Sequence, residues 1–150
     1  GGGGARGAAA GWRRAAARAA KKAAPIAVLS TLGMARLVFT KGVGYQEHVG
    51  EYGVHWNFFH TLAAVGVLTA AAPVPAAARG TLGVLVLAGH QAHLSMFGGS
   101  EWLLSPERDP SSLVSLNKEG IFSAPGYWAM HLIGAQAGAW LAAGAAAAAA

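Results

Sequence analysis

The sequence predicts an all-α protein, a polytopic membrane helical bundle with about four transmembrane helices. Two features of the composition predict this class. Apolar residues make up 54% of the 150 residues and charged residues only 11%, whereas soluble globular proteins carry about 25% charged residues. Segments almost free of Asp, Glu, Lys and Arg also recur along the chain, at lengths near the roughly 20 residues that a helix needs to cross a bilayer.

Basic residues are concentrated at the start of the chain. No Asp or Glu precedes Glu47. Six of the eleven basic residues lie within the first 22 positions, at Arg6, Arg13, Arg14, Arg18, Lys21 and Lys22. We expect residues 1–24 to form a disordered, basic Gly/Ala-rich head and residues 25–150 to form the transmembrane part. The positive-inside rule places such a head in the cytosol, and a transit peptide, which is also basic and poor in acids, is the alternative. No basic face with interleaved aromatic residues is visible, so we expect no nucleic-acid partner.

Four segments have the composition of membrane spans. Residues 23–39 form the first, and Arg36 near its end has a side chain long enough to reach the interface. Residues 54–72 carry no charge, and residues 81–97 carry none but are interrupted by the polar run GHQAH. Residues 125–149 form the longest uncharged segment. The alternative is a soluble all-helical bundle with buried helices, which usually has shorter apolar helices and more charged loops.

The two long polar connections are predicted to lie on the same side of the membrane. Residues 41–53 and 98–124 hold all six acidic residues, whereas the short turn at 73–80 holds two prolines and Arg79. With a cytosolic N-terminus and four spans, both long loops face away from the cytosol, and the turn faces the cytosol. The two loops could therefore build a single site.

The stretch YQEHVGEYGVHWNFFH, residues 45–60, carries the densest set of titratable groups. If it is helical, Glu47, His48, Glu51 and His55 lie within one arc of about 100°. A carboxylate beside an imidazole raises its basicity and fixes its tautomer, which suits a general base. The alternatives are a metal site, although no known zinc spacing is present, and a structural role in which these groups bond one another.

Other polar residues allow further interpretations. His90 and His93 lie three positions apart on one helix face, and with His48 and His55 they could bind haem in a four-helix bundle. Hydrogen bonds between helices are the more ordinary explanation. Cysteine is absent, which excludes cysteine nucleophiles, disulfides and thiolate metal sites.

Two blocks of the sequence resemble a known family. The first runs from Lys41 through YQEHVGEYGVHWNFF, and the second is HQAHLSMFGGSEWLLSPERDPSSLVSLNKEGIFSAPGYWAMHL. Their order and spacing resemble the GWT1/PIG-W family of inositol acyltransferases of glycosylphosphatidylinositol (GPI) anchor assembly. The positions that match in the second block are Gln91, Leu94, Trp102, Arg108, Asn117, Lys118, Glu119, Gly120, Ile121, Ser123, Gly126 and Tyr127. Family members are several times longer, so we expect this chain to be an internal piece of one.

The resemblance implies an O-acyltransferase of the endoplasmic reticulum membrane, with several spans and two lumenal loops. Its reaction would move a fatty acyl chain from acyl-CoA to the inositol hydroxyl of GlcN-phosphatidylinositol. Acyl-CoA would be a co-substrate, and no other cofactor and no metal is expected. Partners would be acyl-CoA, the glycolipid substrate and membrane lipid.

The resemblance also suggests roles for particular residues. Glu51, His55 or His48 would act as the base. The substrate-binding residues would be Asn57 and Trp56 as oxyanion donors, Arg108 and Lys118 for phosphate, and the adjacent Asn117 and Glu119. The alternatives are a haem- or metal-binding four-helix membrane protein and an inactive fragment.

Overall fold

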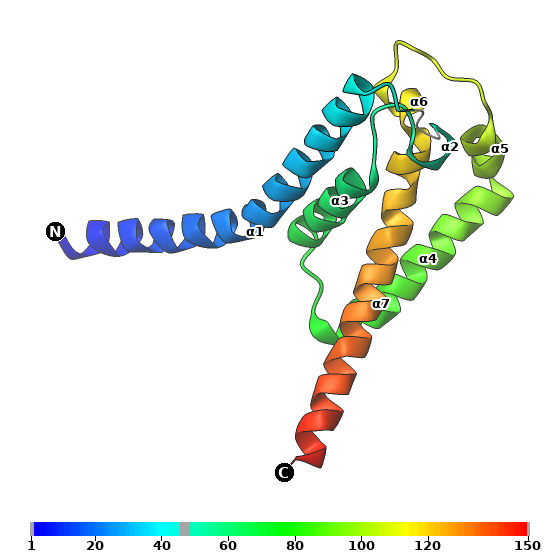
Figure 1. Ribbon diagram of the computed structural model, residues 1–150. Coiled ribbons are helices and arrows are strands. Elements are labelled where there is room, and N and C mark those ends of the chain that lie inside the picture. The colour runs from blue at the N-terminus through cyan, green and yellow to red at the C-terminus, as the bar shows by residue number, and fades with distance from the viewer. Residues whose placement is uncertain (1, 46–48, 150) are drawn as a thin grey trace.

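The computed structural model describes the backbone of residues 2–45 and 49–149, and the side chains of residue 17 and residues 19–45 and 49–149. Over these residues every regular element is a helix, and no strand occurs. The all-α class predicted from the composition is therefore confirmed for this part of the chain. The longer helices lie side by side, and short helices and loops gather at one end of them (Figure 1).

The first helix, α1, runs from Gly2 to Gly42 and contains Pro25. Its part before Pro25 projects away from the other helices, and the helix bends near this residue (Figure 1). Proline removes a backbone hydrogen bond and clashes with the preceding turn, so a bend is expected there. The head at residues 1–24, which we expected to be disordered, is helical from Gly2 onward. Its many alanines, the strongest helix formers, give a physical reason for this difference.

The continuous helix supposed for residues 45–60 is wrong. A short helix, α2, covers Val49–Tyr52, and α3 begins only at Phe58 and ends at Ala71. Gly53 separates them with a φ of +102°, a left-handed conformation that glycine adopts without the steric penalty of a Cβ. The second predicted span, 54–72, thus contains a helix of 14 residues, shorter than the roughly 20 that a perpendicular crossing needs.

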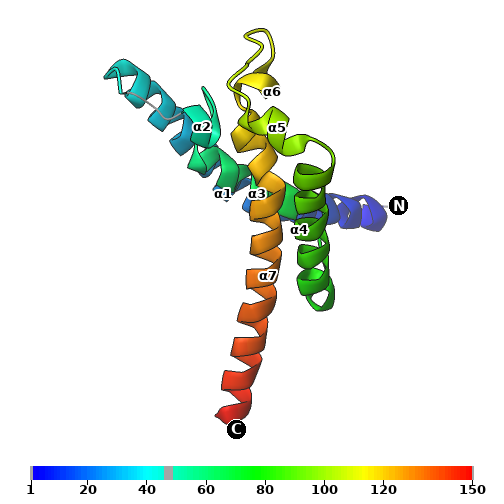
Figure 2. The same ribbon diagram turned by 90° about the vertical axis from the view of Figure 1, so that its right-hand side faces the viewer.

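The second half of the chain is built around one long helix. The 3-10 helix η1 (Ala76–Ala78) leads into α4 (Arg79–Met96), followed by α5 (Gly99–Leu104) and α6 (Leu113–Leu116). Helix α7 (Lys118–Ala148) then runs antiparallel to α4, packs against it and extends beyond it (Figure 2). It also packs against α3, which in turn packs against α1. Helix α7 therefore connects the two halves of the fold.

Small residues set the close approach of these helices. A Cβ atom placed on Gly83 of α4 would lie 2.9 Å from the carbonyl oxygen of Ala129 on α7. On α3, a Cβ atom at Gly66 would lie 2.9 Å from Ile26 of α1. The buried apolar core is correspondingly small, and Ala129 and Leu132 of α7 are among its most buried members. Small residues at helix contacts are typical of membrane helices, where close backbone packing drives association.

By length and composition, one helix of the described residues could cross a membrane, at Ala19–Gly42, and Phe58–Ala71 is apolar but shorter. The four-span arrangement therefore stays a prediction. Large apolar side chains are nevertheless exposed along the outer faces of α1 and α4. They include Val28, Leu32, Met34, Val38, Phe39, Val84, Leu85, Leu87 and Met96.

Candidate functional site

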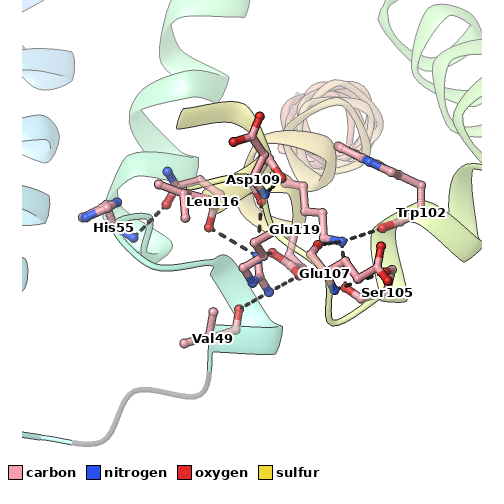
Figure 3. Close-up of polar contacts among 12 residues, drawn as sticks. Val49, His55, Trp102, Ser105, Glu107, Asp109, Leu116 and Glu119 are labelled. Carbon is pink, nitrogen blue, oxygen red and sulfur yellow. Dashed lines mark hydrogen bonds and ion pairs between the residues drawn. The ribbon is translucent and has the colours of Figure 1, made fainter. Parts of the chain in front are cut away.

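The two polar loops meet at the start of α7. The backbone N–H of Val54 donates to the carbonyl of Leu116 at 2.9 Å. The N–H of His55 donates to Asn117 Oδ1 at 2.7 Å, and Figure 3 shows this bond at His55. A Cβ atom on Gly53 would lie 2.5 Å from Asn117 Cα and 2.6 Å from the Leu116 oxygen. Glycine at position 53 therefore serves both the left-handed turn and the close contact between the loops.

Asn117 is the residue that joins them. Besides accepting from His55, its side-chain amide donates to the carbonyl of Leu113 at 2.8 Å. Only 5% of the residue is exposed, so its polar atoms depend on these partners. Nearby, the indole of Trp56 lies directly over Gly120, where a Cβ atom would overlap the ring. The Trp56 Nε1–H donates to Thr61 Oγ1 at 2.9 Å, so this predicted oxyanion donor is engaged within the protein.

Arg108 and Glu119 form a bidentate ion pair. The two terminal nitrogens of Arg108 donate to Glu119 Oε1 at 2.6 Å and to Oε2 at 3.0 Å. The guanidinium also reaches the Leu116 carbonyl at 3.3 Å and the Val49 carbonyl at 3.5 Å. The pair thus ties the loop after α5 to α2 and to the start of α7.

The ion pair sets the ionisation of Glu119. Burial alone would raise the pKa of its carboxyl, but the hydrogen bonds and positive charge of Arg108, together with Lys118, hold that pKa below its usual range. In turn, the hydrogen bond to Glu119 raises the pKa of Arg108. Both side chains are therefore charged at neutral pH.

Lys118 is fully buried, and all three of its ammonium hydrogens have acceptors. The Nζ atom donates to the carbonyls of Trp102 at 2.6 Å, Ser105 at 2.7 Å and Glu107 at 3.2 Å (Figure 3). It also lies 5.2 Å from the centroid of the Trp102 ring, within the range of a cation–π contact. An ammonium has three donors, so in this arrangement Lys118 has none left for the phosphate that we expected it to bind.

Asn57, the other predicted oxyanion donor, is 1% exposed. Its Oδ1 accepts from the N–H groups of Phe59 and His60, which makes it the N-cap of α3. Its Nδ2 donates to the carbonyl of Gly33 on α1 at 2.9 Å. Asn57 therefore starts α3 and fixes it to α1.

The candidate bases differ from this buried set. Glu51 on α2 and His55 after the Gly53 turn are both exposed, and Figure 3 shows the imidazole of His55 turned away from Glu119. Because Gly53 interrupts the helix, Glu51 and His55 do not lie on one face of a continuous helix, as the predicted arc requires. His48 and Glu47 lie outside the described residues. The chain thus brings Glu51 and His55 to the edge of one loop cluster, while their roles stay predictions.

Tyr52 is a neighbour of these groups and was not among the candidate site residues predicted from the sequence. Burial raises the pKa of its hydroxyl, and Tyr127 on α7 and the Glu51 carboxylate raise it further. The tyrosine therefore stays protonated at neutral pH and can donate a hydrogen bond. Its position directly after Glu51, together with the matching Tyr127 of the second block, was the available signal.

His90 and His93 pack against α7. The ring of His93 stacks on Phe122 with centroids 6.2 Å apart, and His90 lies beside Gly126. Within the described residues, no group of three or more His, Cys, Asp and Glu side chains could hold a metal. Both histidines therefore lie at the contact between α4 and α7, while their predicted hydrogen bonds between helices stay a prediction.

The fold and the loop cluster define the class as an all-helical protein with a polar, loop-built site at one end of its helices. The sequence model of GWT1 matches residues 5–149, and the chain belongs to the GWT1 family. The resemblance predicted from the two sequence blocks is therefore confirmed.

Three relatives show the extent of the similarity. An uncharacterized protein of Arabidopsis thaliana is 53% identical over 112 residues, which are 75% of this chain and 25% of that protein. The phosphatidylinositol-glycan biosynthesis class W protein of Dictyostelium discoideum is 45% identical over 112 residues, 75% of this chain and 22% of that protein. GPI-anchored wall transfer protein 1 of Schizosaccharomyces pombe is 38% identical over 113 residues, 74% of this chain and 24% of that protein. The chain spans about a quarter of the length of these relatives.

Proposed function

We propose that this chain forms part of the active site of an acyltransferase of GPI-anchor biosynthesis. The reaction would transfer a fatty acyl chain from acyl-CoA to the inositol hydroxyl of GlcN-phosphatidylinositol. Membership of the GWT1 family and the names of the relatives support a role in this pathway. The observation that carries the proposal is the His55–Asn117 hydrogen bond, because it joins the two sequence blocks of the family into one loop cluster.

The reaction needs a base and no covalent enzyme intermediate. The inositol oxygen attacks the thioester carbon, the C–S bond breaks, and the CoA thiolate leaves. A base takes the hydroxyl proton during the attack, and a proton then returns to the thiolate. Glu51 and His55 are the exposed titratable groups at the edge of the cluster, and we assign the base to one of them.

The buried polar residues would hold the site rather than contact the substrate. Asn57, Asn117 and Lys118 are each at most 5% exposed, and their bonds run to backbone groups of other segments. Arg108 also donates from both terminal nitrogens, to Glu119 and to the carbonyls of Leu116 and Val49. In this arrangement it too would position the site, and a phosphate contact would require the ion pair with Glu119 to open.

The proposal includes a membrane orientation. Residues 23–39, 54–72, 81–97 and 125–149 would lie in the endoplasmic reticulum membrane, with the basic N-terminus in the cytosol and the loop cluster in the lumen. A glycosylation acceptor inserted in the exposed loop at residues 109–111 of the full-length protein should be modified in microsomes. An unmodified loop, beside a modified control site in a known lumenal loop, would contradict this orientation.

Activity of the full-length protein tests the function itself. Microsomes expressing it should transfer acyl chains from labelled acyl-CoA to GlcN-phosphatidylinositol, and the variant with Glu51→Gln and His55→Ala together should lose at least 100-fold of that rate, since general bases contribute about 10²–10⁴-fold. Glu101→Gln, an exposed acid on α5, is the matched control and should keep full activity. Absence of acyl transfer in the wild-type protein would overturn the proposed function. Full activity of the double variant would overturn only the assignment of the base.

A further inference from the structure

A cavity of about 650 Å³ opens far from the loop cluster, among α1, α3, α7 and the turn after α3. Its wall is mostly apolar and includes Ile26 and Leu29 of α1, Leu62 and Val65 of α3, and Leu132 of α7. The volume falls within the range of about 300–1,000 Å³ found for small-ligand sites. Its shape and lining therefore suit an apolar ligand or part of one.

The cavity is separate from the loop site. It reaches α7 at His131 and Leu132, and position 131 lies thirteen residues, or roughly 20 Å, along the helix from Lys118. It also includes Pro73 of the connection between α3 and α4 and Arg79 at the start of α4. This connection lies at the opposite end of the fold from α5 and α6 (Figure 1). In the proposed orientation this end faces the cytosol.

Two cations line the cavity, and no Asp or Glu is among its described lining residues. Lys22 lies one turn before Ile26 and is exposed. Arg79 donates from Nε to the Val74 carbonyl at 3.4 Å. Its two terminal nitrogens make no hydrogen bond within the described part of the chain. Lysine and arginine together suit a phosphate, which both side chains bind through charged hydrogen bonds.

We propose that this cavity binds an anionic phospholipid of the cytosolic leaflet. Its acyl chain would enter between α1, α3 and α7, and its phosphate would lie between Lys22 and Arg79. The cytosolic leaflet carries the anionic lipids, which attract basic residues at the membrane surface. The site needs the chain to lie in a membrane, but it does not need the transferase reaction.

Photochemical labelling of the full-length protein tests this site. The probe is phosphatidic acid with a diazirine in its acyl chain, present at low fraction in a phosphatidylcholine bilayer, and labelled peptides are identified by mass spectrometry. We expect labelling of peptides from residues 23–30 and 128–136, displaced by unlabelled phosphatidic acid. If palmitoyl-CoA displaces the probe at lower concentrations than phosphatidic acid, the site belongs to the acyl donor and the phospholipid assignment is overturned.

Charge variants separate this site from general attraction to the bilayer. Lys22→Gln and Arg79→Gln should each lower labelling about fivefold and together roughly 30-fold. These factors follow from the free energy with which one basic residue is attracted to an anionic membrane surface. Lys21→Gln, an exposed neighbour outside the cavity lining, should leave labelling unchanged. Equal labelling in the double variant and in the wild type would overturn the proposal.

A cavity-filling pair provides the second readout. Ala135 lines the cavity on α7, whereas Ala137 is exposed and lies outside the lining. Ala135→Phe should abolish labelling at residues 23–30, and Ala137→Phe should not. Absence of labelling in the wild-type protein would mean that other segments of the full-length protein fill the cavity, and it too would overturn the proposal.

Discussion

The side-chain oxygen of Asn117 accepts a hydrogen bond from the backbone N–H of His55 at 2.7 Å, across 62 positions of the sequence. Through this bond the start of α7 determines where the loop with the candidate bases lies. Asn117 also holds the Leu113 carbonyl, so one buried amide fixes three segments. Under the proposed function, a residue of this kind would position the site rather than contact the substrate.

Asn117→Ala should lower both stability and acyl transfer. It leaves the His55 N–H and the Leu113 carbonyl without their partner, at a cost of about 1–3 kcal/mol for each buried group that stays unpaired. Asn117→Asp keeps the acceptor for His55 and should retain more of the rate. Thermal unfolding gives the stability of each variant, and steady-state kinetics on folded protein give kcat and KM. Equal rates for the Ala and Asp variants, at equal folded fractions, would contradict the positioning role.

The Arg108–Glu119 pair should make stability sensitive to acid. The pKa of Glu119 lies below its ordinary value, so the folded state favours the charged carboxylate and binds a proton less readily than the unfolded chain. This stabilisation is fully present above the unfolded pKa of about 4.3 and is lost as the pH falls through the lower folded pKa. Unfolding temperatures measured from pH 7 to pH 3 should therefore drop more steeply in the wild type than in Glu119→Gln.

The same variant tests the strength of the pair. We expect Glu119→Gln to lower the free energy of unfolding by about 2 kcal/mol at pH 7, less than the 3–5 kcal/mol lost when a fully buried pair is broken. The reason is that 16% of the Arg108 side chain and 10% of the Glu119 side chain remain exposed. Glu107→Gln is a control, since the Glu107 carbonyl rather than its carboxylate contacts Lys118. Parallel pH profiles in wild type and Glu119→Gln would show that the pair does not control acid stability.

Lys118→Met should release the loop that follows α5. The change leaves the carbonyls of Trp102, Ser105 and Glu107 without their common donor, and we expect a loss of about 3 kcal/mol from hydrogen bonds to a charged group. Amide hydrogen exchange at residues 102–112 should become faster, while exchange in the middle of α4 stays unchanged. Unaltered exchange in the loop would mean that Lys118 does not fasten it.

Gly53→Ala should be strongly destabilising, whereas Gly50→Ala should not. At Gly53 the φ of +102° and the 2.5 Å approach to Asn117 Cα both exclude a Cβ atom, and we expect a loss of at least about 2 kcal/mol. Gly50 lies in α2 with open space around it, so alanine there should be neutral or stabilise by up to about 1 kcal/mol. Chemical denaturation of the two variants gives the comparison. A Gly53→Ala protein as stable as Gly50→Ala would show that the turn can rearrange.

Much of the fold could be predicted from local pattern. The uncharged run in residues 125–149 and the apolar run after Asn57 each contain a helix, as their composition predicts. The break at Gly53 was harder to predict because glycine is tolerated inside helices at a cost of only about 1 kcal/mol. The contact with Asn117, a residue 64 positions later, requires the turn, and no local window contains it.

The sequence by itself determined the helical class, the uneven charge and the family, because composition, the length of uncharged segments and the order of motifs do not depend on which distant residues come into contact. Tertiary structure decided which polar residues remain available. Lys118, Asn57 and Asn117 resembled substrate ligands in the sequence, but each satisfies backbone groups of a distant segment, because a buried donor or acceptor must find a partner. Glu51 and His55 remain exposed because the turn at Gly53 takes them away from that buried network.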